Sequence, residues 1–477
     1  MRILHISAEC YPAAKAGGLG DVVGALPKYL NRRGHETSVI IPKYKTGWIG
    51  AQQATPVFEG KAPYNLDSFE FTVEQVENPQ LGYPLYLVDI PGKFDREGIY
   101  FDPWSGQPFW DEMDRFFCFQ IAVLEWVIQS DEPPGIVHSH DHHASLVPFM
   151  MTRCYRYDKL AAIPTVVTIH NGEYQGRYDR YHYTRLPAFD LDEIGLLDWD
   201  GNLNALASGI KCAWRVTTVS KGYLNELMDF CHGLEQLLKM EQKKTSGLLN
   251  GIDMEVWNPE TDPFLQKNYS LRNRVTGKKI NKEFLCGEFG FNEKLPLFSF
   301  IGRLAREKGA DLVADLIASL TGDEPQLNIL VLGTGDPDLH RRFNELSGKH
   351  AGYFNSRLEY NEKLAHRIYA GSDFLIMPSR IEPCGLNQMY AMRYGTVPVA
   401  RSTGGLADTI IDISDTDGYG VLFREFTVSA AGESVRRSME LYNQRSKFSG
   451  IIKKVMKLDF SWEKASLQYE NLYKQLT

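Results

Sequence analysis

Short apolar runs alternate with longer stretches of helical periodicity from one end of the chain to the other. Runs of this length separated by helical patterns predict parallel strands joined by crossover helices. In the first half, the predicted strands are Arg2–Ser7, Glu36–Ile41, Pro84–Asp89, Gly135–Ser139, Pro164–Ile169 and Arg215–Val219. In the second half, they are Leu295–Gly302, Leu327–Leu332, Tyr353–Leu358, Asp373–Met377, Thr396–Ala400 and Tyr419–Phe423. Two such sets predict an α/β protein built from two doubly wound, Rossmann-like domains.

The boundary between the two domains is predicted in a polar stretch, Met240–Gly247, that follows a helical segment. Residues 1–245 then form the first domain and residues 246–460 the second. Residues 461–477 contain an amphipathic helix, which is expected to pack back on the first domain. The segment from Gly50 to Gly82 is interpreted as irregular, an excursion at the edge of the first domain. Ligands of doubly wound sheets bind outside the carboxyl ends of the strands, so the expected site is a cleft between two facing domains.

Composition narrows the class of protein and leaves its chemistry open. The chain has 477 residues, of which 43% are hydrophobic and 23% charged, as is usual for a globular protein of two or three domains. A net charge of −8 argues against nucleic acid or an anionic membrane as the main partner. No apolar run approaches the length that spans a bilayer, and the chain begins with a strand rather than a signal peptide. The seven cysteines stand singly, which is typical of reduced thiols in a cytoplasmic protein.

One loop of the second domain combines a carboxylate with a place for an anion. It follows the predicted strand Asp373–Met377, and its single carboxylate is Glu382, which precedes a proline and is therefore biased to an extended backbone. The amides of Gly385 and Leu386 open the next helix without intrahelical partners and, with the helix dipole, suit an anion. This combination fits a sugar attached to a phosphate. The alternative is a solvated surface turn with an incidental glutamate.

A glycine-rich loop follows the first strand of the first domain. Gly17 and Gly18 let backbone amides approach a phosphate closely, and Lys15 can supply a positive charge. Asp21 is placed to cap the following helix, and Pro27 is expected to kink that helix or to break it in two. The loop matches neither Gly-x-Gly-x-x-Gly nor a Walker loop, so an ordinary glycine-rich turn is the alternative.

Two of the positive side chains that follow the first strand of the second domain are candidates for binding phosphate. Arg303 can bind phosphate oxygens in bidentate fashion, and Lys308 offers a compact charge. Their place at the carboxyl end of a strand favours a functional role.

After the next strand, Asp336 and Pro337 predict the N-cap and the first position of a helix. An ordinary strand-to-helix turn explains that segment fully, and the same holds for the turn at Thr403–Leu406.

A run of histidines, His138 to His143, raises a metal hypothesis. On a strand, His138 and His140 face the same side, as in binuclear hydrolases with a His-x-His pair. Those hydrolases need further ligands on later strands, whereas the histidines in the second half of the chain, in helical or loop contexts, are His340, His350 and His366. We therefore favour Asp141 as the functional member, with the histidines in supporting or core roles.

His170 and Asn250 are further candidates. His170 ends the strand after the histidine run and can hydrogen-bond a sugar hydroxyl, although a lone histidine is more often structural. Asn250 lies in a turn near the domain boundary, where it either meets a ligand or only shapes the turn.

Taken in order, these motifs resemble the bacterial glycogen synthases and plant starch synthases, which are retaining glycosyltransferases of the GT-B architecture. The resemblance runs through nearly the whole chain. The matching segments are Lys15–Leu19, His138–Asp141, His170-Asn171 with Tyr174–Gly176, Gly233–Glu235, Leu249–Asp253, Arg303–Lys308, Gly333–Asp336, Glu382–Leu386 and Thr403–Leu406. It implies transfer of glucose from ADP-glucose to the non-reducing end of an α-1,4-glucan, with no metal or other cofactor.

The resemblance also implies roles for individual residues. Arg303 and Lys308 are expected to hold the diphosphate, helped by amides near Gly18 and Leu386. The residues expected to hold the glucosyl ring are Glu382, Asp141, His170 and Asn250, with the backbone at Cys384 and Gly385. The remaining assignments are Tyr360 beside the adenine, Lys15 near the diphosphate and reacting centre, and Glu9 on the acceptor side.

Two positions and one segment depart from the family pattern. Ala16 stands where many members have threonine, which should matter little. Asn387 stands where threonine is common, next to the phosphates, and an amide donor there predicts altered affinity rather than lost activity. The segment Val219–Tyr223 reads Val-Ser-Lys-Gly-Tyr in place of Val-Ser-Pro-Thr-Tyr, so the contacts to the acceptor are open at this point.

Three other functions compete with this one. Another retaining transferase, such as a sucrose- or trehalose-phosphate synthase, is disfavoured by the Lys15–Leu19 and Glu382–Leu386 segments together. A non-catalytic glucan- or nucleotide-sugar-binding protein is disfavoured because Glu382, Arg303 and Lys308 are all present. A metal hydrolase would be sensitive to chelators.

The sequence leaves open whether the donor is ADP-glucose or UDP-glucose. It also leaves open the oligomeric state, allosteric control and the preferred glucan length. It also leaves open whether Glu382 is a nucleophile in a double displacement or, as we favour, a ligand of sugar hydroxyls during attack on the leaving group's own face.

Overall fold

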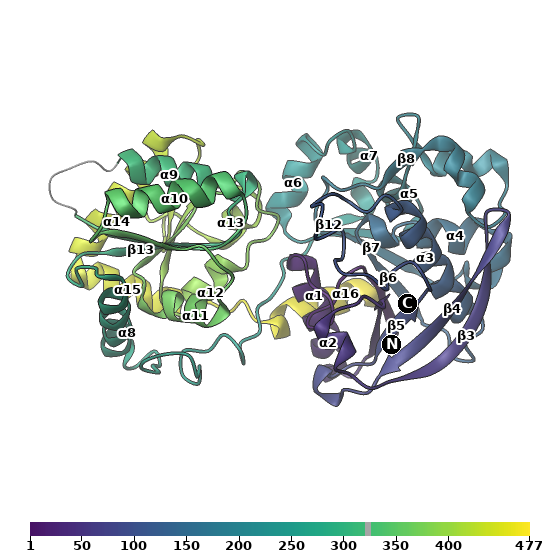
Figure 1. The fold of residues 1–477 in the computed structure, drawn as a ribbon, viewed down its shortest axis with the longest axis horizontal. Helices are drawn as coiled ribbons and strands as arrows, with labels where there is room; N and C mark the ends of the chain where they lie inside the picture. The colour runs from purple at the N-terminus through teal and green to yellow at the C-terminus, as the bar shows by residue number, and fades with distance from the viewer. Residues whose placement is uncertain (320–325) are drawn as a thin grey trace. The chain divides into compact units, whose positions relative to one another are not determined.

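The computed structural model describes residues 1–319 and 326–477, and the contacts divide the chain into two compact units. Unit 1 comprises Met1–Val219, Leu224–Leu248 and Trp462–Thr477, and unit 2 comprises Ser220–Tyr223 and Leu249–Ser461. Each unit is built on a largely parallel sheet with helices packed on it (Figure 1). The predicted α/β class is therefore confirmed.

The large sheet of unit 1 has nine strands in the order β12-β11-β7-β6-β1-β2-β5-β4-β3. Its parallel strands are β1 (Arg2–Ile6), β2 (Glu36–Pro42), β5 (Leu85–Asp89), β6 (Ile136–His140), β7 (Thr165–Ile169), β11 (Arg215–Thr218) and β12 (Thr245–Gly247). A smaller sheet contains β8 (Arg177–Asp179), β10 (Asn202–Asn204) and β9 (Asp198–Trp199). Because β1 pairs with both β2 and β6, the strand order reverses between β1 and β6, and the loops after these strands are neighbours.

Most of the residues between Gly50 and Gly82 form an antiparallel hairpin with one register shift between Pro56 and Phe58, so the prediction of irregular structure there was wrong. β3 (Ala54–Tyr64) pairs antiparallel with β4 (Asp67–Val76), which in turn pairs antiparallel with β5. These are the long purple strands of Figure 1, which extend the sheet at its edge. In β4 only some residues, such as Phe71 and Val73, are buried, so the segment lacks the continuous apolar run that marks the other strands.

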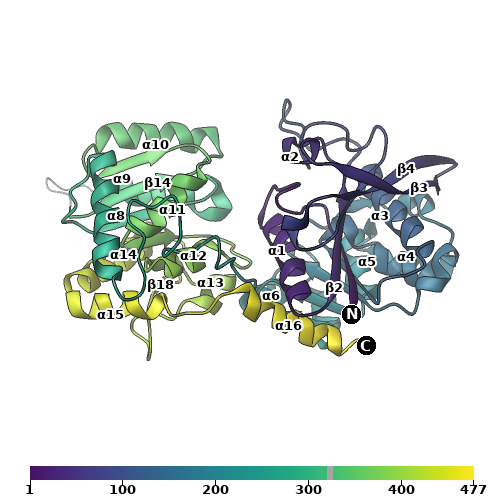
Figure 2. The ribbon, with the colours of Figure 1, turned by 90° about the horizontal axis from the view of Figure 1, so that it is seen from below.

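The C-terminal helix α16 (Trp462–Lys474) packs against α1 (Gly18–Arg32) within unit 1. Tyr469 and Tyr473 of α16 join Val22 and Leu26 of α1 in one buried cluster, and the two helices lie side by side in Figure 2. The other helices that begin before residue 245 are α2 (Gly47–Gly50), α3 (Glu112–Ile128), α4 (Val147–Arg153), α5 (Ala205–Cys212), α6 (Lys221–Asp229) and α7 (Glu235–Met240).

Helix α1 continues through Pro27, so the break that was one of the two outcomes expected there does not occur. Pro27 has no N–H to donate to Val23 O, and its ring crowds the preceding turn. The Cys10 thiol lies 3.8 Å from Val23 O, and the Tyr83 hydroxyl donates to Gly24 O at 3.2 Å. These side chains bring donors to the carbonyls next to the proline, which compensates for the missing backbone bond.

Among the described residues, the sheet of unit 2 has six parallel strands in the order β15-β14-β13-β16-β17-β18. They are β13 (Leu297–Ile301), β14 (Asn328–Leu332), β15 (Phe354–Arg357), β16 (Phe374–Met377), β17 (Val397–Arg401) and β18 (Val421–Phe423). Successive residues of β14 enter two different clusters, Ile329 and Val331 one of them and Leu330 and Leu332 the other, so both faces of the sheet are buried. The strand order reverses between β13 and β16, where doubly wound sheets bind their ligands.

Eight helices of unit 2 cover this sheet in the part of the chain that the structure describes. They are α8 (Arg274–Phe289), α9 (Ala310–Ser319), α10 (Pro337–Lys349), α11 (Glu362–Gly371), α12 (Asn387–Arg393), α13 (Gly404–Thr409), α14 (Val428–Asn443) and α15 (Arg445–Val455). The predicted start of α10 is confirmed, since Asp336 is its N-cap and accepts from the Asp338 amide at 2.8 Å. Among the described residues, no helix has the length and apolar character needed to cross a bilayer. All seven cysteines are free thiols.

Candidate active site

The loops after β13 and β16 meet at the reversal point of the unit 2 sheet. Lys308, in a 3-10 turn at Arg306–Lys308, donates to both carboxylate oxygens of Glu382, at 2.8 and 2.9 Å. Ser379 donates its hydroxyl to Glu382 Oε2 at 2.9 Å. Glu382 is 5% exposed, and these bonds stabilise a charge that burial would otherwise disfavour. Lys308 and Glu382 were predicted separately, whereas Ser379 was not predicted.

Arg303 lies on the same loop as Lys308 and is far more exposed. Its guanidinium pairs with Glu307 at 2.5 Å, and the two side chains are 67% and 41% exposed. Such an ion pair in water is worth ~0.2–1 kcal/mol, so the guanidinium can exchange it for a stronger anionic partner. Glu307 O also accepts from the Arg380 amide at 2.8 Å, which ties the two loops together.

The loop after β16 is packed closely between its neighbours. A Cβ on Gly309 would lie 2.2 Å from Pro378 O, and a Cβ on Gly405 would lie 2.0 Å from Cys384 O. Gly385 has a φ of +71°, where L side chains are strained. Burial raises the pKa of the Cys384 thiol to about 12, so this thiol is not a nucleophile at neutral pH.

Three other predicted residues of unit 2 occupy different environments. Asn387 follows Leu386, the N-cap of α12, and donates its amide to Ile301 O at 2.7 Å, so one N–H that we expected near phosphate holds the end of β13. Asn250 is buried beside Cys384, and its Oδ1 has no hydrogen-bond partner among the described residues. Tyr360 is 78% exposed and lies between β15 and α11.

In unit 1, Glu9 organises the glycine-rich loop. Its Oε2 accepts from the amides of Ala16 and Gly17 at 2.6 and 2.9 Å, and its Oε1 accepts from the Tyr100 hydroxyl at 2.7 Å. Glu9 is 3% exposed, so its carboxylate is a buried support for the loop backbone. Neither this support role nor Tyr100 was predicted.

The N-cap of the helix that follows the glycine-rich loop is not the residue that was predicted. Gly17 is the N-cap of α1, and Asp21 lies inside the first turn, where it accepts from Lys15 Nζ at 2.7 Å, so the predicted cap at Asp21 was wrong. Gly17 has a φ of −148°, and a Cβ on Gly17 or on Gly18 would meet nothing within 4 Å. The chain's own packing therefore places no steric demand for glycine at these two positions.

Asp141 joins the loops after β6 and β7. Its Oδ1 accepts from the amides of His170 at 2.7 Å and Asn171 at 3.4 Å. Asp141 has a φ of +53°, a strained conformation of the kind that gathers at functional sites. Burial raises the pKa of the Asp141 carboxyl to about 7. The fold thus brings Asp141 and His170 into contact.

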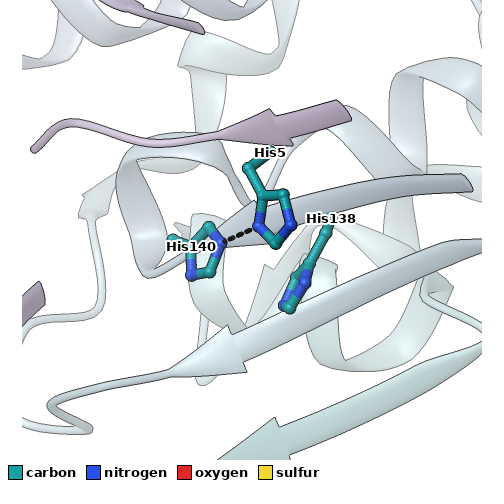
Figure 3. Close-up of side chains that lie close together, drawn as sticks. All are labelled: His5, His138 and His140. Atoms are coloured by element: carbon teal, nitrogen blue, oxygen red, sulfur yellow. Dashed lines mark hydrogen bonds between the residues drawn. The ribbon is translucent and has the colours of Figure 1, made fainter. Parts of the chain in front are cut away.

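Behind these loops lies a buried group of rings, His5, His138 and His140 (Figure 3). His5 was not predicted. It lies opposite His138 in the pairing of β1 with β6, so finding it requires the strand order and not only the local pattern. Both ring nitrogens of His138 are engaged, Nδ1 with the Tyr473 hydroxyl at 2.7 Å and Nε2 with Thr168 Oγ1 at 2.6 Å. Burial holds the pKa of each of the three rings below its usual range, so the rings are neutral.

Known proteins resemble the chain over its whole length. Residues 2–240 match the family model of the starch synthase catalytic domain, and residues 281–455 match that of the glycosyl transferases group 1. A glycogen synthase of Flavobacterium johnsoniae is 45% identical over 99% of this chain and 98% of its own length. The chain belongs to the glycogen and starch synthases.

Other members of this family agree in sequence and in structure. A glycogen synthase of Streptococcus uberis is 37% identical over 100% of this chain and 99% of its own. The catalytic domain of Starch Synthase IV from Arabidopsis thaliana, solved with ADP and acarbose, matches with a TM-score of 0.87 at 31% identity, covering 100% of this chain and 99% of that one. A sucrose-phosphate synthase from Thermosynechococcus elongatus, at 15% identity and a TM-score of 0.61, shares only the fold. The predicted GT-B fold and glycogen or starch synthase function are confirmed, and this synthase is a hexosyltransferase of a family that uses nucleotide-sugar donors.

Proposed function

We propose that this synthase transfers glucose from ADP-glucose to the non-reducing end of an α-1,4-glucan, in the cytoplasm, with retention and without a metal. The observation that carries the proposal is the contact of Lys308 with Glu382 at the reversal point of a doubly wound sheet. It sets a cation suited to phosphate beside a carboxylate suited to sugar hydroxyls. The related starch synthase solved with ADP supports ADP as the nucleotide, and the free cysteines suit a reducing compartment.

The donor diphosphate is assigned to Arg303 and Lys308, with the amides of Gly385 and Leu386 and with Tyr360 beside the adenine. Lys308 already balances the charge of Glu382, so the diphosphate needs a further cation. Arg303 supplies it by leaving its weak pair with Glu307. From unit 1, Lys15 and the backbone of Gly17 and Gly18 are assigned to the same group, and the absence of a steric demand for glycine there supports close approach by a ligand.

The glucosyl ring is assigned to Glu382, Asn250, Asp141 and His170, with the backbone at Cys384 and Gly385. A carboxylate has about four lone-pair sites, and three hydrogen bonds leave Glu382 one for a sugar hydroxyl. The buried Oδ1 of Asn250 lacks a partner among the described residues, and a hydroxyl donor would relieve that cost. Glu9 is assigned to the acceptor side through the loop that it supports.

The reaction separates negative charge on ADP from positive charge on the sugar, and these residues stabilise the separated charges. The bond from C1 to the β-phosphate breaks, the bond from C1 to the glucan oxygen forms on the same face, and the phosphate takes the hydroxyl proton. Negative charge gathers on the departing ADP, where each positive or amide donor is worth about 3–4 kcal/mol at the transition state. Glu382 is already held by three hydrogen bonds, which supports its role as a ligand over that of a nucleophile.

Purified enzyme incubated with glycogen and either ADP-glucose or UDP-glucose tests this proposal through the nucleotide released. We expect ADP release that persists in EDTA and a product that α-amylase degrades. Release of UDP alone, or loss of activity with the chelator that a metal restores, would contradict the assigned donor or the metal-free mechanism. Arg303→Ala should reduce ADP release by about two to three orders of magnitude.

A further inference from the structure

Three histidines of unit 1 form a hydrogen-bonded chain that ends at His170. Nδ1 of His5 lies 2.9 Å from Nε2 of His140, a contact drawn in Figure 3, and Nδ1 of His140 lies 3.0 Å from Nε2 of His170. His5 and His140 are completely buried, and His170 is 8% exposed. One ring comes from β1, one from β6 and one from the residue after β7, so the sheet itself fixes their spacing.

The rings of this chain are neutral, and that restricts where their protons lie. Burial lowers the pKa of His5 and of His170 to about 3, and that of His140 far below its usual range. A neutral imidazole has one N–H donor and one acceptor nitrogen. Each contact in the chain therefore joins one donor to one acceptor, and the direction of the first bond determines the direction of the second.

The free end at His5 decides that direction. Nε2 of His5 is buried and has no hydrogen-bond partner among the described residues. An unpaired buried N–H is rarer in native structures than an under-used acceptor, so the proton of His5 lies on Nδ1. Nδ1 of His5 then donates to His140, and Nδ1 of His140 donates to His170.

We propose that His5 and His140 are positioning residues that hold His170 in the tautomer with its proton on Nδ1. The inference rests on the proposed function, in which His170 contacts the glucosyl ring. Nε2 of His170 is occupied as an acceptor, so Nδ1–H is the one donor that the ring offers to a sugar oxygen. Without the chain, the ring would divide between two tautomers, and only part of the enzyme would present this donor.

The same rings are poorly suited to a metal ion, although His5, His138 and His140 each bring a nitrogen within 4.8 Å of the others. Both nitrogens of His138 and both of His140 already make hydrogen bonds. A bound cation would break some of these bonds and would lie fully buried among three neutral rings, and among the described residues no carboxylate belongs to this group to balance the charge of the cation.

Nitrogen NMR of the full-length enzyme labelled with ¹⁵N-histidine tests the proposal directly. The His170→Asn variant identifies the His170 signals by their loss. We expect a protonated Nδ1 and an unprotonated Nε2 at His170. A proton on Nε2 would overturn the proposal, and so would a stoichiometric metal ion that His5→Phe removes. The spectrum needs no transfer reaction, so its result is independent of whether ADP-glucose is the donor.

Two substitutions at His5 separate hydrogen-bond donation from packing. His5→Phe fills the space and removes the donor, whereas His5→Asn packs less well and keeps an amide N–H near the position of Nδ1. We expect kcat to fall about tenfold in His5→Phe and only about twofold in His5→Asn, with the KM for glycogen unchanged in both.

His138→Phe is the matched control, because it also loses buried hydrogen bonds but lies outside the chain, and we expect it to keep its kcat. A folded His5→Phe variant with the kcat of the unsubstituted enzyme would contradict the proposal. If His5→Phe does not fold, the spectrum of the unsubstituted enzyme decides the question.

Discussion

At the scale of the residue, Lys308 serves the fold as well as the proposed diphosphate site, because a buried carboxylate is stable only with its counterion. We expect Lys308→Ala to lower the free energy of unfolding by about 3 kcal/mol, because it leaves the buried carboxylate of Glu382 without its counterion. Arg303→Ala removes only an exposed pair and should leave stability within about 0.5 kcal/mol. Both variants should lose about two to three orders of magnitude in turnover.

Urea unfolding together with assays of ADP release distinguishes these roles. The double variant Lys308→Ala/Glu382→Gln should recover most of the lost stability, because no charge remains buried, and none of the lost turnover. Equal stability of the two single variants would show that Lys308 does not compensate Glu382.

Gly17 differs from Lys308, because the fold does not require a glycine at this position whereas the proposed donor site does. Gly17→Ala should keep the stability, because its backbone is extended and its Cβ would meet nothing within 4 Å. If the loop backbone approaches a phosphate, the same methyl group should raise the KM for ADP-glucose by about tenfold, or ~1.4 kcal/mol. Gly47→Ala at the first position of α2, also with nothing within 4 Å, is the control. Identical kinetics of the two variants would remove Gly17 from the donor site.

At the scale of the element, the sequence predicted the central strands of both sheets, because strands buried on both faces are short and rich in apolar and β-branched residues. It failed where an element is half exposed, as in the hairpin of β3 and β4. It also failed where distant side chains compensate a local fault, as Cys10 and Tyr83 do beside Pro27. The sequence pattern around Pro27 cannot predict such compensation, because the side chains that provide it are distant in the sequence.

Helix α16 offers a test of such a distant contact. Tyr473→Phe should lower the free energy of unfolding by about 1–2 kcal/mol, because the His138 ring would lose a buried partner that lies 2.7 Å away. Tyr44→Phe is the matched control, since the buried Tyr44 hydroxyl has no hydrogen-bond partner among the described residues, and its removal should cost little. Urea unfolding measures both, and a cost in Tyr44→Phe equal to that in Tyr473→Phe would refute the assignment.

At the scale of the whole molecule, strand order decides which predicted residues meet. The sequence identified Lys308 and Glu382, and Asp141 and His170, as candidates at strand ends, but the contacts between them arise because β13 lies beside β16 and β6 beside β7. The same principle explains why His5 was missed, since its importance depends on β1 lying next to β6. Pairing partners across a parallel sheet are set by the packing of whole crossover units, which no single stretch of sequence specifies.

Buried histidines also determine how the stability of the molecule depends on pH. Burial lowers the pKa of His5, His138, His140, His143 and His170, so the folded state leaves them neutral where the unfolded state, with a pKa near 6.5, takes up protons. The unfolded state then binds more protons, and the free energy of unfolding falls as the pH drops below about 6.5. Asp141 acts in the opposite direction, because its raised pKa, about 7 against 3.8, lets the folded state keep a proton that the unfolded state loses.

The histidines outnumber this single carboxyl, so we expect the free energy of unfolding to fall steadily from about pH 6.5 to pH 5. The fall is up to ~1.4 kcal/mol per pH unit for each additional proton that the unfolded state binds relative to the folded state. Urea unfolding at several pH values measures the slope. His5→Asn removes one titrating ring from the unfolded state and should make the slope shallower by about one proton, whereas Gly47→Ala should leave it unchanged. A stability that stays constant from pH 7 to pH 5 would mean that these rings take up protons in the folded protein, and the neutral hydrogen-bonded chain that ends at His170 could then not exist.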